Sequence, residues 1–189
     1  KRLGAVIEAS DVRPSVKEQV ESLGATFIDV SYDTPEEKEA AVGVGGYAKP
    51  MPQSWLDRQK VEVAKRVAQA DIVITTALIP GRAAPVLVTE DMVKSMKPGS
   101  VIVDLAAPQG GNCPLTEAGQ TVVKHGVTLV GETNLPALVA ADSSSLYARN
   151  VLDFLKLILP KDATAVKVDM EDDIVAACLM TQNGEVRRK

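Results

Sequence analysis

The chain has 189 residues, of which 46% are hydrophobic and 24% are charged, and its formal net charge at pH 7 is −4. These values are typical of a globular protein with one substantial core. The mildly acidic chain has no block of Lys and Arg, so nucleic acid is excluded as an expected partner, and no apolar run is long enough to cross a bilayer.

The first third of the chain predicts a strand, a helix and a second strand, followed by a loop. Residues 4–9 form a short apolar run of the kind found in buried parallel strands. In residues 15–23, apolar positions recur at helical spacing between a proline and a glycine. Residues 26–30 predict the second strand, and the glycine-containing stretch 31–52 predicts a long loop, a feature that is usually functional or disordered.

The middle of the chain continues the alternation of helices and strands. Residues 55–70 predict a helix and residues 71–75 a strand. Thr89 is placed to cap a short helix that ends at Met96, and residues 101–105 predict a further buried strand. This alternation favours an α/β domain with a parallel sheet.

The last third predicts less regular structure. Two apolar runs around His125 predict a hairpin or two short strands, and this histidine is interpreted as a turn residue. Residues 145–159 predict an amphipathic helix, and residues 166–186 a β-rich tail with a turn at Asn183-Gly184. We expect a first domain over residues 1–142 and a C-terminal helix and tail over residues 143–189.

Asp11 is the first candidate for a binding residue. It follows the first strand, where a dinucleotide-binding domain carries the acidic residue that accepts hydrogen bonds from the adenosine ribose. Glu8 is the alternative if that strand ends early. Position alone supports a second role equally well, in which Asp11 caps the helix that begins near Pro14.

A glycine-rich phosphate loop is missing from this sequence. In such domains it lies about 20 residues before the acidic residue and follows the first strand. The glycines at 43, 45 and 46 follow no predicted strand and open no predicted helix, so we reject them for this role. The strand that this loop follows is the central strand of the family of dinucleotide-binding sheets, and it is also missing from residues 1–189. The two strands that would flank it would each have an unpaired edge.

Five segments of the chain form a recognisable set, namely GAVIEASDVRP at 4–14, GGYAK at 45–49, TTALIPG at 75–81, MKPGSVIVDLA at 96–106 and GGNC at 110–113. Taken together, they resemble the NAD(H)-binding domain of proton-translocating nicotinamide nucleotide transhydrogenase alpha subunits. The similarity covers nearly the whole chain in the family's order. Alanine dehydrogenases share the fold and the regions 79–81 and 97–99, whereas segments 110–113 and 131–136 favour transhydrogenase.

The resemblance implies a Rossmann-like doubly wound parallel sheet, here without its first strand and glycine-rich loop, and NAD(H) as the cofactor. Ligands of open α/β sheets bind beyond the carboxyl ends of the strands, which places the ends of two strands at the site. No residue is expected to act as an acid, a base, a nucleophile or a metal ligand. The expected cofactor-binding residues are Asp11, Val12, Arg13, Tyr47, Thr75, Thr76, Ala77, Leu78, Asp104, Leu105, Ala106 and Asn134.

Some of these residues have a second interpretation. The carboxylate of Asp11 would repel a 2′-phosphate and favour NAD(H), although an arginine such as Arg13 can accept that phosphate. The resemblance implies that Tyr47 lies on a loop that closes over the nucleotide, but it can also be a surface tyrosine. Asp104 and Asn134 can equally be turn residues.

The resemblance implies hydride transfer between NAD(H) and NADP(H), coupled to proton translocation by partner subunits. The implied partners are an NADP(H)-binding domain, a membrane subunit and a second copy in a homodimer, at the cytoplasmic or mitochondrial-matrix face of a membrane. Two alternatives stay open, an alanine dehydrogenase-like NAD-dependent oxidoreductase and a non-enzymatic fragment. Because the phosphate loop is missing, we expect weak or no NAD binding by residues 1–189 alone.

Overall fold

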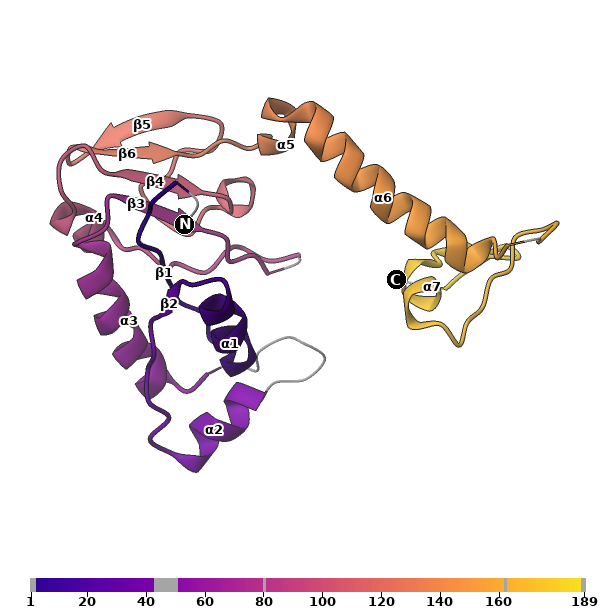
Figure 1. Cartoon of the computed structure of the whole chain (residues 1–189), viewed down its shortest axis with the longest axis horizontal. Coiled ribbons are helices and arrows are strands. Elements are labelled where there is room, and N and C mark those ends of the chain that lie inside the picture. Colours follow the sequence, from indigo (N-terminus) through magenta and orange to yellow (C-terminus); the bar gives the residue numbers. More distant parts are fainter. Residues whose placement is uncertain (1–2, 43–50, 80, 162, 188–189) are drawn as a thin grey trace. The chain divides into compact units, whose positions relative to one another are not determined.

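The computed structural model describes residues 3–42, 51–79, 81–161 and 163–187; Tyr47, predicted to cover the nucleotide, lies outside these described residues. The chain forms two compact units, Lys1–Thr133 and Asn134–Lys189 (Figure 1). This division falls earlier in the chain than the boundary after residue 142 suggested by the sequence pattern. Each unit is described by itself.

The first unit begins with a small parallel strand pair. Strand β1 (Glu8–Ala9) pairs with β2 (Thr26–Phe27), and helix α1 (Pro14–Ser22) connects them, as the sequence pattern predicts. Both strands are shorter than the predicted runs, and the side chain of Val6 is 94% exposed. Among the described strands, β1 has β2 as its only partner, so only one edge of β1 is paired.

Helix α2 (Pro35–Val42) occupies part of the segment predicted as a loop, so that prediction is wrong there. The helix begins with a capping box, in which the Glu37 N–H donates to Thr34 Oγ1 at 3.2 Å and the Thr34 N–H donates to Glu37 Oε2 at 3.4 Å. The Thr-x-x-Glu spacing at 34–37 is the sequence signal for this helix start. Helix α3 (Gln53–Val67) follows and confirms the predicted helix.

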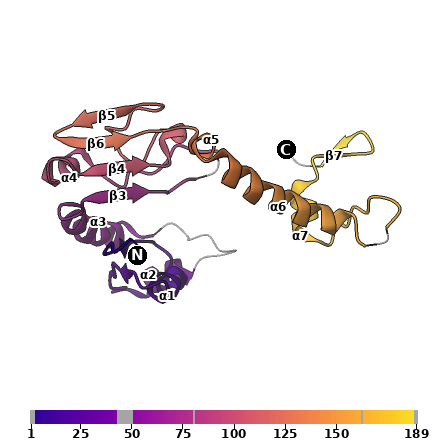
Figure 2. The ribbon, with the colours of Figure 1, turned by 45° about the horizontal axis from the view of Figure 1, so that its top comes forward.

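A four-stranded sheet forms the rest of the first unit, with the strand order β3-β4-β6-β5 (Figure 2). Strands β3 (Ile72–Thr75), β4 (Val101–Asp104) and β6 (Val127–Val130) are parallel, and β5 (Thr121–Lys124) is antiparallel to β6. The predicted α/β architecture with a predominantly parallel sheet is therefore confirmed.

Two turns in this unit follow the sequence pattern. The β5–β6 connection has positive φ at His125 (53°) and Gly126 (79°), which suits a tight hairpin turn. Helix α4 (Glu90–Ser95) is capped by Thr89, whose Oγ1 accepts a hydrogen bond from the Met92 N–H at 3.4 Å. Both the hairpin and the cap confirm the predictions made for them.

The core of the first unit lies on one face of the four-stranded sheet. There α3 and α4 pack against the sheet, and Ile102, Val127 and Leu129 are fully buried. A second, smaller cluster lies around Trp55, whose ring stacks on Tyr32 with the ring centroids 5.7 Å apart. The main core consists of Val67, Val88, Met92, Val93, Met96, Ile102, Cys113, Val127 and Leu129.

The opposite face of the sheet is incompletely covered at β3. The side chains of Ile72 and Ile74 are 65% and 63% exposed. Strand β3 also bonds only to β4 among the described strands, which leaves its other edge unpaired. Parallel sheets are normally buried on both faces. Among the strands that the structure describes, β1 and β3 thus each have one unpaired edge, as the sequence predicts.

The second unit is mostly helical. Helix α5 (Leu135–Leu138) precedes the long helix α6 (Ala140–Ile158), which has no fully buried residue. Helix α6 begins earlier than the predicted helix and ends close to the predicted end. Its exposed apolar residues include Leu146, Tyr147 and Leu152.

The C-terminal tail contains more helix than the sequence pattern predicts. Helix α7 (Asp173–Cys178) begins beside Asp172, whose Oδ1 accepts hydrogen bonds from Ile174 N at 2.9 Å and Val175 N at 3.0 Å. Only the two-residue strands β7 (Thr181–Gln182) and β8 (Glu185–Val186) bear out the β-rich prediction, with the predicted turn between them. Within the described residues, no helix combines the length and the apolarity needed to cross a membrane.

Candidate functional site

Asp11 lies in a tight turn between β1 and α1. Its Oδ1 accepts hydrogen bonds from the Arg13 backbone N–H at 2.8 Å and from Arg13 Nε at 2.9 Å, and its Oδ2 accepts from Arg13 Nη2 at 2.8 Å. Arg13 precedes Pro14 and has the extended backbone (φ −94°, ψ 120°) that a following proline favours. The carboxylate and the guanidinium thus form a local bidentate pair.

This pair settles one of the open alternatives for Asp11. The residue that caps α1 is Arg13, and no side chain caps the helix start. Burial raises the pKa of the Asp11 carboxyl, but the hydrogen bonds and charge of Arg13 outweigh this effect and lower the pKa below its usual value. Asp11 is therefore an ionised, partly exposed carboxylate at the end of a strand, and its side chain is 25% exposed.

Asp104 is the centre of a second group, at the ends of β3 and β4. Its side chain is 1% exposed, and the end of β4 is tied to β3 by the Leu105 N–H, which donates to Thr75 O at 2.9 Å. Five donors bond to the carboxylate of Asp104, namely Thr75 Oγ1 (3.2 Å), Ala106 N (3.0 Å), Asn112 N (2.8 Å), Cys113 N (3.1 Å) and Thr116 Oγ1 (2.8 Å). The geometry thus favours the interpretation of Asp104 as a turn acceptor that shapes the strand ends.

Asn112 holds the segment that follows β3. Its Nδ2 donates to Ala77 O at 2.9 Å and to Pro85 O at 2.7 Å, and its Oδ1 accepts from the Ala77 N–H at 3.1 Å. Its neighbour Gly111 has φ +78°, and a Cβ at that position would lie 2.8 Å from Asp104 Oδ2. The segment contributes to the family resemblance, but sequence reasoning did not identify Asn112 as a site residue. An asparagine after paired glycines, close behind a strand end, was the available signal.

The predicted site residues differ in how exposed they are. Thr75, Asp104 and Ala106 are buried, whereas Thr76 and Leu78 are exposed beyond the end of β3. Val12, Arg13, Ala77 and Leu105 are half-buried. Asn134 belongs to the second unit, where it caps α5 without a side-chain hydrogen bond to that helix.

The structure brings together some of these residues. Thr75 and Asp104 are in direct contact, and Ala77 is fixed to the same group through Asn112. Strand β1 is connected to α3 by an ion pair, in which Arg66 Nη1 donates to Glu8 Oε1 at 3.1 Å. The convergence of Asp11 with the ends of β3 and β4 on one nucleotide pocket stays a prediction.

Two surface cavities lie near the end of β2. The larger has a volume of 480 Å³ and includes Lys17, Asp29 and Tyr32 in its lining, and the smaller has a volume of 330 Å³ and includes Arg58 and Glu62. Neither lining includes a predicted site residue from the described part of the chain.

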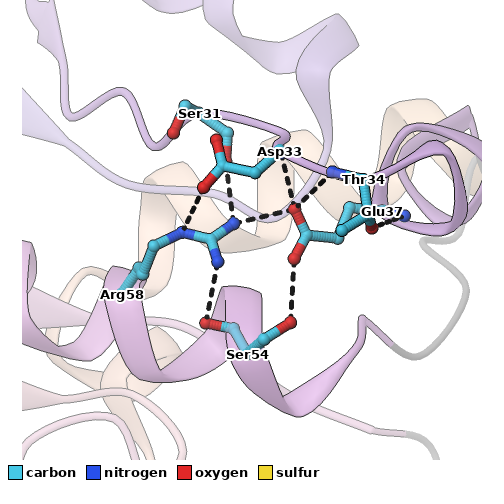
Figure 3. Close-up of polar contacts among 6 residues, drawn as sticks. All are labelled: Ser31, Asp33, Thr34, Glu37, Ser54 and Arg58. Atoms are coloured by element: carbon cyan, nitrogen blue, oxygen red, sulfur yellow. Dashed lines mark hydrogen bonds and ion pairs between the residues drawn. The ribbon is translucent and has the colours of Figure 1, made fainter.

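A buried ionic cluster joins α2 to α3 (Figure 3). The side chain of Glu37 is fully buried, and its carboxylate accepts hydrogen bonds from Arg58 Nη2 at 2.7 Å, Ser54 Oγ at 2.8 Å and the Asp33 N–H at 2.8 Å. Arg58 Nη2 also donates to Ser31 O at 3.1 Å. Burial raises the pKa of Glu37, but these hydrogen bonds outweigh it and lower the pKa to about 2. We call Glu37, Arg58 and their partners the Glu37 cluster.

The cysteines and the histidine do not form a reactive centre among the described residues. Cys113 is buried and Cys178 exposed, and both are free thiols. Burial raises the pKa of the Cys113 thiol, which keeps it protonated. His125 lies 3.2 Å from Glu90 Oε1 in the hairpin turn. No group of three or more His, Cys, Asp or Glu residues in the described part of the chain is arranged to hold a metal ion.

Comparisons with known proteins agree with the resemblance. The family model "Alanine dehydrogenase/PNT, C-terminal domain" matches residues 1–189. An NAD(P) transhydrogenase subunit alpha protein of Rhodospirillum rubrum is 52% identical over 186 residues, which are 98% of this chain and 48% of that protein. Alanine dehydrogenase of Bacillus subtilis is 41% identical over 131 residues, which are 67% of this chain and 34% of that protein.

Solved structures of the same two kinds share the fold. A transhydrogenase from Sinorhizobium meliloti superposes with a TM-score of 0.76 at 45% identity, over 98% of this chain and 46% of that one. An L-alanine dehydrogenase superposes with a TM-score of 0.63 at 26% identity, over 98% of this chain and 45% of that one. The chain thus spans about half the length of the Rhodospirillum rubrum and Sinorhizobium meliloti relatives, which match 98% of it.

Proposed function

The chain belongs to the alanine dehydrogenase/PNT C-terminal domain family, and from this membership we propose that it is the NAD(H)-binding part of a transhydrogenase alpha subunit. The observation that carries the proposal is the extent of the similarity. The transhydrogenase relative matches 98% of the chain at 52% identity, whereas the alanine dehydrogenase of Bacillus subtilis matches 67% at 41% identity. The proposed reaction is hydride transfer between NAD(H) and NADP(H), coupled to proton translocation by other subunits.

The strand ends fit the adenosine side of a dinucleotide. The ionised carboxylate of Asp11 is the group that accepts hydrogen bonds from ribose hydroxyls, and it is partly exposed. In the proposed site, Thr76, Ala77 and Leu78 contribute the wall beyond β3. The buried Thr75 and Asp104 keep that wall in place. Val12 and Leu105 contribute half-buried apolar surface, and Ala106 is buried.

Hydride transfer between two nicotinamides requires little acid–base catalysis by the protein. The bound nucleotide supplies the hydride chemistry, and the protein determines distance, orientation and access of water. The described residues accordingly contribute binding surface and hydrogen-bond acceptors. In the same proposal, Asn134 and Tyr47 act near the nicotinamide and over the bound nucleotide.

We propose that residues outside 1–189 complete the nucleotide site. Strands β1 and β3 each lack one strand neighbour among the described residues, and Ile72 and Ile74 are exposed on a sheet that should be covered. A parallel strand that ends in a glycine-rich loop would satisfy the backbone groups of both edges and supply the phosphate contacts. The relatives are about twice as long as this chain, so they have residues available for that role.

Calorimetry with NADH tests this proposal directly. Residues 1–189 are expected to bind NADH weakly or not at all, and a protein extended upstream by the strand and loop is expected to bind it in the micromolar range. If the extended protein shows no heat of binding, the nucleotide proposal is wrong and a non-enzymatic module is the better interpretation.

A coupled assay separates the two enzymatic alternatives. Hydride exchange between NADH and an NADP analogue should require an added NADP(H)-binding domain, whereas oxidation of alanine by an alanine dehydrogenase would not. The proposed partners are that domain, a membrane subunit at the cytoplasmic or mitochondrial-matrix face, and a second copy in a homodimer. Alanine oxidation by the extended protein without any partner would favour the alternative.

A further inference from the structure

The Asp11–Arg13 pair commits a guanidinium to the carboxylate that the proposed function assigns to the ribose. Nε and Nη2 of Arg13 face the two oxygens of Asp11 at 2.9 and 2.8 Å, the geometry of a bidentate pair. The backbone N–H of Arg13 adds a third bond to the same carboxylate. Such a planar fork gives the pair directional strength that a lysine would lack.

A second basic side chain near these strand ends is also committed. Residues 10–32 contain two basic residues, Arg13 and Lys17. Lys17 forms an ion pair with Asp29. A nucleotide that approaches the end of β1 therefore meets two cations that are already neutralised by carboxylates. An arginine beside the acidic residue is the group that accommodates a 2′-phosphate in dinucleotide-binding domains.

We infer that the Asp11–Arg13 pair is the specificity-determining element of the site, because Arg13 positions Asp11 for the ribose hydroxyls and is itself withheld from a 2′-phosphate. This inference rests on the proposed nucleotide function. Asp11 alone would repel a 2′-phosphate, and Arg13 alone could accept one. Because Arg13 is paired with Asp11, both side chains then favour NAD(H) over NADP(H).

The hydrogen-bond capacity of Asp11 is consistent with this division of roles. A carboxylate has about four acceptor positions. The Arg13 N–H and Nε donate to Oδ1 and Nη2 donates to Oδ2, and the Asp11 side chain is 25% exposed, so a ribose hydroxyl can still reach the carboxylate. The side chain of Arg13 has five N–H donors, of which the fork uses two. A 2′-phosphate that bonds to the others would lie beside the Asp11 anion and share a guanidinium whose charge is already paired, both of which are unfavourable.

A double-mutant cycle in the full-length protein tests the inference by equilibrium binding of NADH and NADPH. We expect Asp11→Asn to weaken NADH binding and to raise the affinity for NADPH relative to NADH by about tenfold or more, because Arg13 is released. Arg13→Gln in the wild-type background should change NADPH affinity by less than about twofold. In the Asp11→Asn background the same substitution should abolish the gain.

The cycle distinguishes sequestration from simple repulsion. If Asp11→Asn/Arg13→Gln retains the gain in relative NADPH affinity, removal of the negative charge explains it and the inference is wrong. Lys17→Gln is the matched control for the loss of a nearby cation, and it should leave the preference unchanged. If wild-type protein binds NADH but the effects of the two substitutions are additive, the inference fails while the proposed function stands. If wild-type protein binds neither nucleotide, both fail.

A measurement without nucleotide examines the pair itself. The carboxyl carbon of Asp11 is followed by NMR through an acid titration in wild-type and Arg13→Gln protein. The Asp11 pKa should rise in the variant, whereas Lys17→Gln should not shift it comparably. An Asp11 pKa that is the same in wild-type and Arg13→Gln protein would show that the fork does not persist in solution, and the inference would then be abandoned.

Discussion

The carboxylate of Glu37 is buried between two helices and is nevertheless held in its charged form. Three kinds of donor meet it there, namely a guanidinium, a hydroxyl and backbone N–H groups (Figure 3). Its pKa is lowered to about 2 from the ordinary 4.5. The cluster therefore stabilises the folded chain fully above the ordinary pKa and loses this contribution as the pH falls towards 2.

We predict that Glu37→Gln makes stability less dependent on acid. The urea midpoint of the wild-type protein should fall steeply between pH 5 and 2, and that of the variant should be lower at pH 7 and fall less over the same range. Glu36→Gln is the control, because it makes the same change of charge at an exposed position of α2. Equal pH profiles for wild-type and Glu37→Gln protein would contradict the proposed role of the cluster.

Asn112 gives a second prediction at the level of one residue. Asn112→Ala removes three hydrogen bonds and leaves the N–H and C=O of Ala77 and the C=O of Pro85 without these partners. The expected loss of unfolding free energy is about 2–4 kcal/mol. Urea denaturation measures it, with the exposed Gln120→Ala as the control. A loss no larger than that of the control would show that the segment after β3 does not depend on Asn112.

The sequence pointed to Asp11 and to the strand ends because strand-end residues follow from the hydrophobic pattern. It could not separate binding residues from supporting residues, because that depends on donors brought in from elsewhere. The carboxylate of Asp104 accepts hydrogen bonds from Asn112, Cys113 and Thr116, and these donors lie beside it only in the folded loop. Arg13 was recognised, but its bidentate contact with Asp11 depends on the turn geometry.

The elements with the strongest periodicity were predicted best. Helix α3 and strands β3 and β4 match their predicted positions closely. Strands β1 and β2 have only two residues each, because they pair with each other in an isolated two-stranded sheet, whereas β3 and β4 belong to a four-stranded sheet. Helix α7 was missed because Ile174 and Val175 favour strands, whereas the Asp172 cap favours a helix.

The end of strand β6 supplies a prediction at the level of an element. A Cβ on Gly131 would lie 2.3 Å from the backbone O of Glu117, so this segment has no room for a side chain. We expect Gly131→Ala to lower the unfolding free energy by about 3 kcal/mol. Gly119→Ala has open space but a φ of +75°, and it should cost only about 1 kcal/mol. If thermal denaturation gave equal losses for the two variants, the close approach at Gly131 would be wrong.

At the scale of the whole molecule, substitution of the exposed side chains on β3 is expected to affect stability differently in residues 1–189 alone and in a protein extended upstream. In residues 1–189 alone, Ile72→Thr with Ile74→Thr should reduce the binding of the hydrophobic dye ANS and leave stability nearly unchanged. In a protein extended upstream, the same pair should cost about 1–3 kcal/mol, because these side chains would then be covered. Dye fluorescence and urea midpoints measure the two effects.

Val61→Thr, on the exposed side of α3, is the control for the β3 pair, and it should behave alike in both proteins. If the Ile72→Thr/Ile74→Thr pair destabilises residues 1–189 as strongly as the longer protein, the β3 face is already covered in the short chain. The proposed source of the missing strand would then have to be abandoned.

The carboxylate of Asp104 also restricts which residue can occupy position 111, seven residues later. A methyl group at position 111 would meet Asp104 Oδ2 at 2.8 Å, and the φ of +78° at that position disfavours other residues as well. Any replacement at 111 thus acts on position 104, and an alanine at 104 relieves the contact but leaves the N–H groups of Asn112 and Cys113 without their acceptor. A joint replacement at 104 and 111 is therefore expected to cost stability as the single replacements do, so this turn constrains both positions.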